Sequence, residues 1–248
     1  MRALALLAAP LVTACGEPRE VLVGTAASLS EPMTAVAAAY GADRPDVRVR
    51  LVVGASNVLA EQMRAGAPID LLVSADPRVL DRLAADAVVE PAGRVRLAGN
   101  RLVVLVRQGL PVATASAEQL LAAQIRRIAV PDAAVPVGRY ARDWLAARGL
   151  LAALEPRIVA TADARATLAA VDAGDVDAAI VYATDARLAA SARTAFEIAA
   201  AEQPEIAYEA ALRAGAGDEA RAFFAFLAGG GAARALAVAG FSPPPGAP

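Results

Sequence analysis

The 248-residue chain contains no histidine and no lysine, so all 24 of its basic residues are arginines. Without histidine it cannot build a Ser-His-Asp or Cys-His catalytic site, or an HExxH zinc site. Without lysine it cannot form a Schiff base, a Walker phosphate-binding motif or a Ser-x-x-Lys pair. The single cysteine, Cys15, excludes an intrachain disulfide and a CxxC metal motif. These absences remove the commonest hydrolase, zinc and nucleotide-hydrolysing sites.

Aromatic residues (4%) and net charge (−2) are also low, although 57% of the residues are hydrophobic. A slightly acidic chain does not attract phosphate backbones, so nucleic acid is not expected as a partner. Most of the apolar excess is alanine. Beyond the N-terminus, no apolar run approaches the ~18 residues that a membrane-spanning helix needs. The length suits one large or two modest α/β domains.

The first fifteen residues have the pattern of an export signal. Arg2 gives a positive start, residues 3–12 are apolar, and small residues precede Cys15. The stretch VTAC resembles the lipobox of bacterial lipoproteins, whose cysteine is lipidated and becomes the new N-terminus. We therefore expect a signal peptide over residues 1–14 and a lipidated tether over residues 15–20. The tether would hold the protein on the periplasmic or cell-surface side of the cytoplasmic membrane. A plain secretory signal with an incidental Cys15 is the alternative.

Apolar stretches of strand length alternate with helical stretches along the chain, which predicts an α/β fold with largely parallel sheets. The expected strands cover residues 21–24, 47–53, 69–74, 97–106, 127–130, 157–160, 178–182, 196–199 and 206–212. The expected helices include residues 29–40, 57–65, 77–86, 116–123, 136–147, 164–173 and 232–239, and one that Asp218 caps. Residues 243–248, rich in proline and glycine, are expected to form a disordered tail.

Four expected helices begin after a turn of small residues at the carboxyl end of a strand. The unpaired N–H groups and the positive dipole end of a helix start favour a bound anion. The four starts lie at Ser28, Ser56, Val137 and Ala164, and Tyr182 ends a strand at the same edge. This arrangement indicates one anion held by neutral donors.

No low-complexity linker divides the chain, so a boundary between lobes must lie within a strand that crosses from one lobe to the other. Residues 97–106 fit an outward crossing and residues 206–212 a return crossing. The expected first lobe therefore comprises residues 21–100 and 210–242, and the expected second lobe comprises residues 101–209.

Six stretches, in the same order, resemble the periplasmic substrate-binding protein of molybdate ABC transporters. They are AASLSEPM, GASNVLAEQMRAGAPIDLLVSAD, GNRLVVLV, PVGRYARDWL, DARATLAAVDAGDVDAAIVYATDA and AVAGF. The resemblance spans nearly the whole mature chain, and GAPIDLLVSAD and IVYATDA are its most specific parts. It implies a two-lobed periplasmic-binding-protein fold of type II, with mostly parallel sheets flanked by helices and two interlobe crossings. It also implies a protein that binds its ligand, with no enzymatic activity and no cofactor.

In that family, two serine hydroxyls, backbone amides and one tyrosine hydroxyl hold a tetrahedral oxyanion in the cleft between the lobes. The resemblance places these roles on Ser28, Ser56, Val137, Ala164 and Tyr182, which would reach the metal of molybdate only through its oxygens. This chain has GAS where relatives often carry a run of serines, which leaves the number of donors unchanged.

These residues also have structural interpretations. Ser28 and Ser56 fit helix N-caps, and Ser28-x-x-Glu31 fits a capping box, although a capping hydroxyl can still donate its hydrogen outward. Tyr182 could be a core tyrosine whose hydroxyl is satisfied internally. Its place at the end of a strand, before polar residues, favours the cleft.

Other motifs near these positions carry less weight. Asp70, Asp76 and Asp185 are interpreted as caps or interlobe contacts, because an uncompensated carboxylate would repel a dianion. The arginines are expected to be solvated. GASNV lacks the last glycine of a GxSxG nucleophile turn, and GAGDEA near the end matches only a loose dinucleotide fingerprint.

The leading hypothesis is an extracytoplasmic, lipid-anchored, monomeric protein that binds molybdate or tungstate. Its partner would be the membrane permease of an ABC importer. One alternative keeps the fold but changes the ligand to sulfate or another small oxyanion. A second alternative is a lyase or transferase on the same fold that uses arginine and carboxylate groups.

Overall fold

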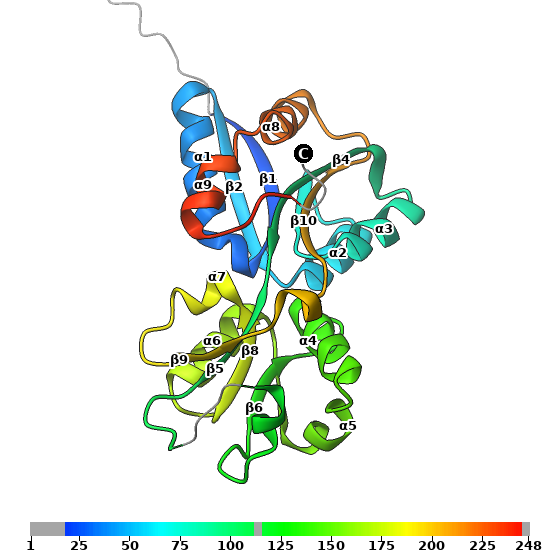
Figure 1. The fold of residues 1–248 in the computed structure, drawn as a ribbon. Helices are drawn as coiled ribbons and strands as arrows, with labels where there is room; N and C mark the ends of the chain where they lie inside the picture. Colours follow the sequence, from blue (N-terminus) through cyan, green and yellow to red (C-terminus); the bar gives the residue numbers. More distant parts are fainter. Residues whose placement is uncertain (1–17, 112–115, 245–248) are drawn as a thin grey trace, which may run out of the picture.

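The computed structural model describes residues 18–111 and 116–244. Within them the chain forms two lobes, each built on one five-stranded sheet flanked by helices (Figure 1). The two-lobed α/β fold predicted from the sequence is confirmed. The expected signal peptide, the Cys15 lipidation site and the last four residues of the expected tail lie outside the described residues.

The first sheet has the strand order β2-β1-β3-β10-β4. Its first three strands run parallel, whereas β10 runs antiparallel to both of its neighbours. The central strands are buried on both faces, which explains why they appear in the sequence as continuous apolar runs. The strands are β1 (Arg19–Ala26), β2 (Val47–Gly54), β3 (Leu71–Ser74), β4 (Val89–Asn100) and β10 (Ile206–Arg213).

The second sheet has the order β7-β6-β8-β5-β9 and the same design. Three strands run parallel, and β5 runs antiparallel to β8 and β9. The expectation of parallel sheets therefore holds for three strands of each sheet, and both sheets are mixed. The strands are β5 (Leu102–Val106), β6 (Ile128–Pro131), β7 (Ile158–Thr161), β8 (Ala178–Tyr182) and β9 (Arg193–Glu197).

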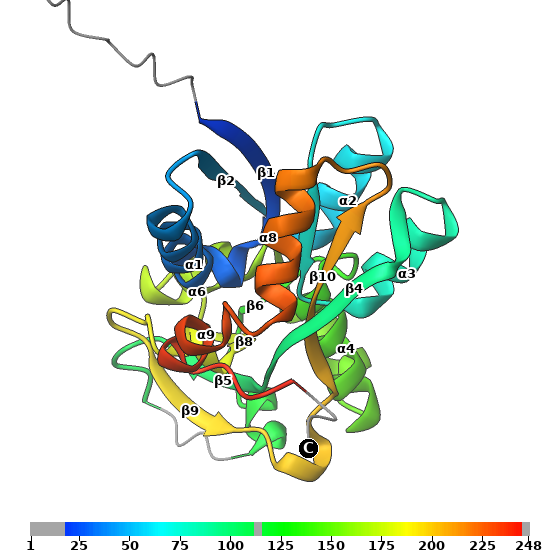
Figure 2. The ribbon, with the colours of Figure 1, turned by 90° about the horizontal axis from the view of Figure 1, so that it is seen from above.

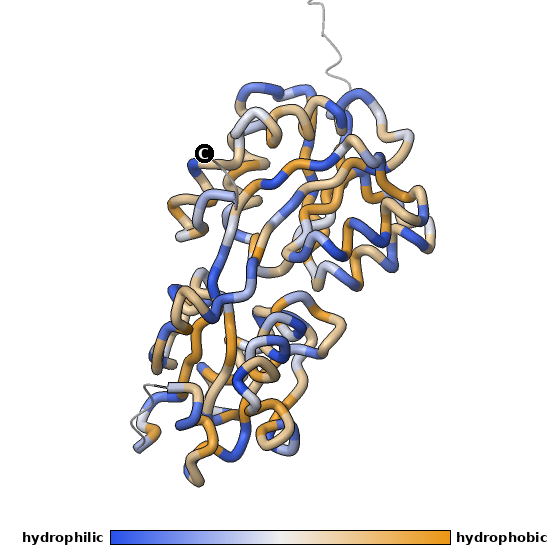
Figure 3. Tube along the Cα trace, turned by 45° about the vertical axis from the view of Figure 1, so that its right-hand side comes forward, coloured by the Kyte–Doolittle hydropathy of each residue, from blue (hydrophilic) through white to orange (hydrophobic). Residues whose placement is uncertain are grey.

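Helices cover both faces of the first sheet (Figure 2). Met33 of α1 and Phe223 of α8 belong to the core on one face, and Leu59 of α2 and Leu80 of α3 to the core on the other. Hydrophobic segments gather at the strands inside each lobe (Figure 3). The helices are α1 (Ser30–Asp43), α2 (Ser56–Arg64), α3 (Pro77–Ala85), α8 (Asp218–Ala228) and α9 (Ala233–Ala239). Across the described residues no single helix is long and apolar enough to span a membrane. Only the pair α8 and α9 together reaches that length and composition, and this pair is bent by 59° at its break.

The second sheet is covered in the same way. Trp144 of α4 packs in the core on one face, and Leu168 of α6 packs on the other. The helices are α4 (Pro136–Ala147), α5 (Leu151–Leu154), α6 (Ala164–Asp172) and α7 (Ala183–Ala186). Short 3-10 turns complete the described chain: η1 (Ala27–Leu29), η2 (Ala117–Leu121), η3 (Glu155–Arg157) and η4 (Ala200–Glu202).

The chain passes between the sheets twice. β4 ends at Asn100 in the first sheet and β5 begins at Leu102 in the second, so the outward crossing lies at Arg101. The single strand expected over residues 97–106 is therefore two strands. On the return, β10 pairs with β4 from its first residue, Ile206, which lies opposite Asn100. The two crossing segments thus run side by side where the lobes meet.

Several predicted helix boundaries shift. α1 continues through Gly41 and ends at Asp43, because Arg44 precedes Pro45 and a residue before proline disfavours helical backbone. The helix expected at residues 116–123 is the 3-10 turn η2. Asp218 is the first residue of α8 and not its cap.

Candidate functional site

A cavity of about 20 Å³ lies between the two lobes. All five residues predicted to bind the ligand line it, together with their neighbours in the same turns. The lining residues are Ala26, Ala27, Ser28, Ala55, Ser56 and Ala75 from the first lobe, and Val135, Pro136, Val137, Asp163, Ala164 and Tyr182 from the second. Sites for organic ligands usually measure about 300–1,000 Å³, so this cavity is too small for such a ligand.

Ser28 and Ser56 line the cavity from the first lobe, but neither serves as the helix cap that the sequence predicted. Ser28 lies inside the turn η1, and Leu29 is the N-cap of α1. Ala55 is the N-cap of α2. The hydroxyl of Ser28 makes no capping bond to α1 and lies 3.0 Å from the hydroxyl of Tyr208.

The hydroxyl of Ser56 has a defined hydrogen-bond direction. Its Oγ accepts from the backbone N–H of Ala75 at 3.1 Å. A backbone N–H can only donate, so the hydroxyl hydrogen of Ser56 is not used in this bond. Ser56 is buried and lines the cavity, so it can donate this hydrogen to a ligand there.

Val137 and Ala164 lie in the first turns of α4 and α6, where backbone N–H groups have no acceptor within the helix. Asp163 caps α6 as predicted, by accepting from the N–H of Ala166 at 2.9 Å. Gly138 lets the start of α4 approach the end of β6, because a Cβ at this position would collide with backbone carbonyl oxygens there. Two helix starts thus present amide donors and positive dipole ends to one small cavity.

Tyr182 ends β8 and is 1% exposed. Within the described residues its hydroxyl has no hydrogen-bond partner, and an unpaired buried hydroxyl is costly. Burial raises the pKa of Tyr182 well above its ordinary value, so the phenol keeps its proton. Tyr182 therefore offers the cavity a donor that a ligand oxygen would satisfy.

Two arginines that follow these helix starts contact acids of the first lobe. Arg139 of α4 donates from Nε and Nη2 to the Oδ2 of Asp76, at 2.9 and 2.7 Å. Arg165 of α6 pairs with Glu31 of α1, and its Nε donates to the carbonyl oxygen of Ala27 at 3.3 Å. The prediction that the arginines are solvated is wrong for these two. Sequence reasoning missed both pairs, because their partners lie far away along the chain.

The three aspartates near this edge behave differently from one another. Asp76 is both a cap, accepting from the N–H of Arg78 at 3.0 Å, and an interlobe contact. Asp70 stays within the first lobe, where it pairs with Arg213 at 2.9 Å. Asp185 is fully buried, and neither of its oxygens accepts a hydrogen bond from a described residue.

The buried Asp185 has an altered acidity. The nearest cation is the Nε of Arg165, at 3.6 Å from its Oδ1. Burial raises the pKa of Asp185 to about 7, against a weaker opposing effect of Arg165. Its carboxyl group therefore titrates close to neutral pH.

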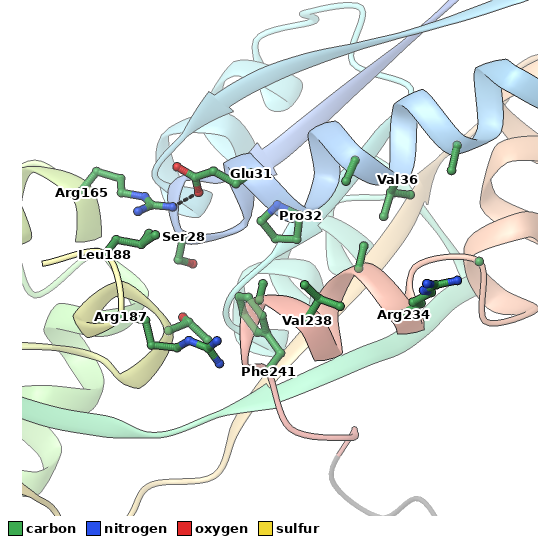
Figure 4. A pocket seen from close by; sticks show the side chains of 16 residues that line it. Ser28, Glu31, Pro32, Val36, Arg165, Arg187, Leu188, Arg234, Val238 and Phe241 are labelled. Atoms are coloured by element: carbon green, nitrogen blue, oxygen red, sulfur yellow. Dashed lines mark hydrogen bonds and ion pairs between the residues drawn. The ribbon is translucent and has the colours of Figure 1, made fainter.

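A larger groove of about 690 Å³ adjoins the small cavity at Ser28, which lines both. Figure 4 shows Val36 of α1 and Val238 of α9 on its walls, and Arg165 with its partner Glu31 at one end. Most of the lining is apolar, and its charged residues are Arg165, which pairs with Glu31, together with Arg187 and Arg234. None of the four other residues predicted to bind the ligand lines this groove.

Comparison with known proteins gives concordant results. The profile of the family described as bacterial extracellular solute-binding protein matches residues 21–242. The chain is 30% identical over 244 residues to the molybdate-binding protein ModA of Haemophilus influenzae, covering 96% of each chain. Its fold is similar to that of the periplasmic molybdate-binding protein of Azotobacter vinelandii (TM-score 0.79, 22% identity, covering 90% of this chain and 99% of that one). It is also similar to that of the sulfate-binding protein SubI of Mycobacterium tuberculosis (TM-score 0.77, 20% identity, covering 91% and 87%).

Proposed function

The chain belongs to the bacterial extracellular solute-binding proteins, and from this premise we propose that it binds molybdate or tungstate and delivers it to an ABC importer. One observation carries the proposal: a cavity of about 20 Å³ between the lobes is lined by hydroxyl and helix-start amide donors from both sides. The donors are Ser28, Ser56, Val137, Ala164 and Tyr182.

The chemistry of the donors matches a fully deprotonated tetrahedral dianion. Each oxygen of such an ion accepts hydrogen bonds and has no hydrogen that needs an acceptor. Phosphate at neutral pH usually carries a proton that needs an acceptor, and the backbone amides of this set can only donate. Sulfate has shorter bonds to oxygen than molybdate, and hydrogen bonds weaken as the donor–acceptor distance grows beyond ~3.2 Å. Backbone amides and short hydroxyls cannot move inward to keep their hydrogen bonds to a smaller ion, whereas a long arginine side chain could.

The donors are divided between the lobes, which couples binding to closure. Ser28 and Ser56 belong to the first lobe, whereas Val137, Ala164 and Tyr182 belong to the second. Only the closed arrangement completes the set, so an anion that contacts both lobes favours closure. The closed protein would then be the form that the membrane permease receives. We propose that the protein acts as a monomeric binding protein, without enzymatic activity and without a cofactor.

Competition calorimetry tests the ligand assignment. The purified protein without its lipid is titrated with sodium molybdate, tungstate, sulfate and phosphate, first separately and then with a competing ion present. Molybdate and tungstate should bind tightly and similarly, and sulfate and phosphate far more weakly. If sulfate displaces molybdate at comparable concentration, the molybdate assignment is wrong, and the sulfate alternative takes its place.

We propose also that Cys15 is lipidated and anchors the protein at the membrane surface. The proposal rests on the stretch VTAC and on the extracellular family to which the chain belongs. One diacylated cysteine carries enough buried CH₂ groups to retain a protein at a bilayer. Cys15→Ser should release the protein from membranes or block its processing. A wild-type protein that is fully soluble after cell fractionation would contradict the anchor.

A further inference from the structure

The guanidinium group of Arg165 lies between two acids that belong to different lobes. Its Nη2 donates to the carboxylate of Glu31, in α1 of the first lobe. Its Nε lies 3.6 Å from the Oδ1 of Asp185, in α7 of the second lobe, to which Arg165 itself belongs. The side chain of Glu31 is 63% exposed, whereas that of Asp185 is fully buried. One cation thus has an exposed partner across the cleft and a buried acid within its own lobe.

The hydrogen bonds that Arg165 makes to described residues all cross to the first lobe. Besides the bond to Glu31, its Nη2 donates to the Oγ of Ser30 at 3.3 Å and its Nε to the carbonyl oxygen of Ala27 at 3.3 Å. Ala27 lines the small cavity, and so does the residue before Arg165 in α6. Arg165 therefore ties together two turns on opposite sides of the cavity, and it can do so only while the lobes are in contact.

Asp185 lacks the hydrogen bonds that a buried carboxylate needs. Neither of its oxygens accepts one from a described residue, and a buried charge without such bonds is costly. The separation of 3.6 Å from the Nε of Arg165 is just beyond the range of a hydrogen bond. A small rotation of the Arg165 side chain would bring the two groups into contact, but that rotation is opposed by the bonds to the first lobe.

Separation of the lobes changes this balance. Arg165 then loses its three partners in the first lobe together, whereas Asp185 moves with it because α6 and α7 belong to the same lobe. The ion pairs of Arg165 with described residues involve only Glu31 and Asp185, so Asp185 is the acid that remains within reach. A bond from Arg165 to Asp185 satisfies both groups in the open protein and makes opening less costly.

We propose that Glu31 and Asp185 compete for Arg165, and that this competition sets how long the lobes stay closed around the ligand. The inference rests on the proposed function, because it concerns release of the bound oxyanion. Glu31 holds Arg165 across the cleft and prolongs the closed state, whereas Asp185 draws it back and favours opening. Removing one acid or the other therefore has opposite effects, although both carry the same charge.

Two substitutions that each remove one negative charge test the competition. Glu31→Gln and Asp185→Asn are measured alone and in combination with Arg165→Ala, which removes the shared partner. Asp175→Asn is the matched control, because it removes an exposed acid from the same lobe as Asp185. The readouts are the molybdate dissociation rate, from stopped-flow displacement by excess tungstate, and the radius of gyration of the ligand-free protein, from small-angle X-ray scattering. Mildly alkaline pH keeps Asp185 ionised, because burial raises its pKa to about 7.

The two acids should act in opposite directions. We expect Asp185→Asn to slow dissociation roughly threefold or more and to make the ligand-free protein more compact, because Arg165 no longer gains a charged partner on opening. Glu31→Gln should speed dissociation by a similar factor. In the Arg165→Ala background both substitutions should lose most of their effect, and Asp175→Asn should keep the wild-type values.

The outcomes separate this inference from the proposed function. If both single variants change the dissociation rate in the same direction, the acids act through their charge on the anion and the competition is wrong. The same follows if their effects persist at full size with Arg165→Ala, or if ligand-free Asp185→Asn has the wild-type radius. If Asp185→Asn fails to fold by circular dichroism, Asp185→Ser takes its place. If the wild-type protein does not bind molybdate, the proposed function is wrong, whereas the ligand-free radii still test the competition.

Discussion

Arg139 of the second lobe donates two hydrogen bonds, at 2.9 and 2.7 Å, to a single carboxylate oxygen of Asp76 in the first lobe. The other oxygen of Asp76 accepts from the backbone N–H of Arg78 at 3.0 Å and caps α3. The Asp76 side chain is 6% exposed and that of Arg139 is 20% exposed, so the pair is largely shielded from solvent. One carboxylate thus caps the start of a helix and joins the lobes beside the small cavity.

Removing this pair should weaken oxyanion binding without unfolding the lobes. A hydrogen bond to a charged group contributes about 1.5–3 kcal/mol, so Arg139→Ala should raise the dissociation constant roughly tenfold or more. The loss should appear mainly as faster ligand dissociation in stopped-flow measurements, because the pair holds the closed state. Asp76→Asn keeps an oxygen for the cap and should have a similar effect. The exposed Arg48 provides the control variant Arg48→Ala, and an equal loss there would contradict this role.

The three hydroxyls that line the cavity should each contribute to affinity. Ser28→Ala, Ser56→Ala and Tyr182→Phe each remove one donor to a charged ligand. Each should weaken molybdate binding by roughly tenfold to a hundredfold, as measured by calorimetry. Circular dichroism should show an intact fold. Wild-type affinity in all three variants would contradict the assignment of these hydroxyls to the binding site.

Ligand binding should make the protein more compact. The donors of both lobes are completed only when the lobes close, so the anion shifts the population toward the closed state. Small-angle X-ray scattering with and without molybdate should show a smaller radius of gyration in its presence. An unchanged radius, together with calorimetric proof of binding, would count against a site between the lobes.

Asp185 should make the free energy of unfolding decrease as pH rises, which is the opposite of the usual effect of a paired carboxylate. Its pKa of about 7 in the folded protein lies above the ordinary value of 3.8, so the folded state binds the extra proton between these values. Its contribution to stability is therefore largest at low pH and is lost as pH rises toward about 7. The free energy of unfolding of Asp185→Asn minus that of the wild type should increase over this interval, by at most ~1.4 kcal/mol per pH unit, and then level off. Urea unfolding at several pH values measures this difference.

A matched variant separates burial from charge in that experiment. Asp43 is exposed at the end of α1, so its carboxylate stays in contact with water when the protein folds. Asp43→Asn should not reproduce the trend of Asp185→Asn. A pH-independent difference for Asp185→Asn would show that the buried carboxyl does not titrate in this interval.

Local chemistry made part of the site predictable. Asp163 followed by small residues indicated a capped helix start, and an apolar run indicated the strand that ends at Tyr182; the structure has both. The cap predicted for Ser28 is wrong because a short 3-10 turn precedes α1 and shifts the helix start by one residue, so that Leu29 is the N-cap. Serine is a favoured N-cap residue, so nothing in the local sequence predicts that its hydroxyl meets the tertiary partner Tyr208 instead.

Contacts between segments that are distant in the sequence could not be predicted from local patterns. Arg139 and Asp76 are 63 positions apart, and Ser28 and Tyr208 are 180 apart. Tyr208 lies in a strand that is buried on both faces, so no alternation of apolar and polar residues shows which way its side chain points. The antiparallel directions of β5 and β10 are likewise set by the path of the chain between lobes and not by local pattern.

The position of β10 has a consequence for how the chain assembles. This strand lies between β3 and β4, although more than a hundred residues separate it from either in sequence. β4 has no neighbour in its sheet until β10 arrives, whereas every strand of the second sheet lies within the continuous stretch between Leu102 and Glu197. Long-range pairings form slowly because their loop-closure entropy must be overcome first. When the chain is synthesised from its N-terminus, all strands of the second sheet are therefore available before β10 is. The first sheet stays incomplete until residues 206–213 are inserted, and its unpaired strand edges are prone to aggregation in the meantime.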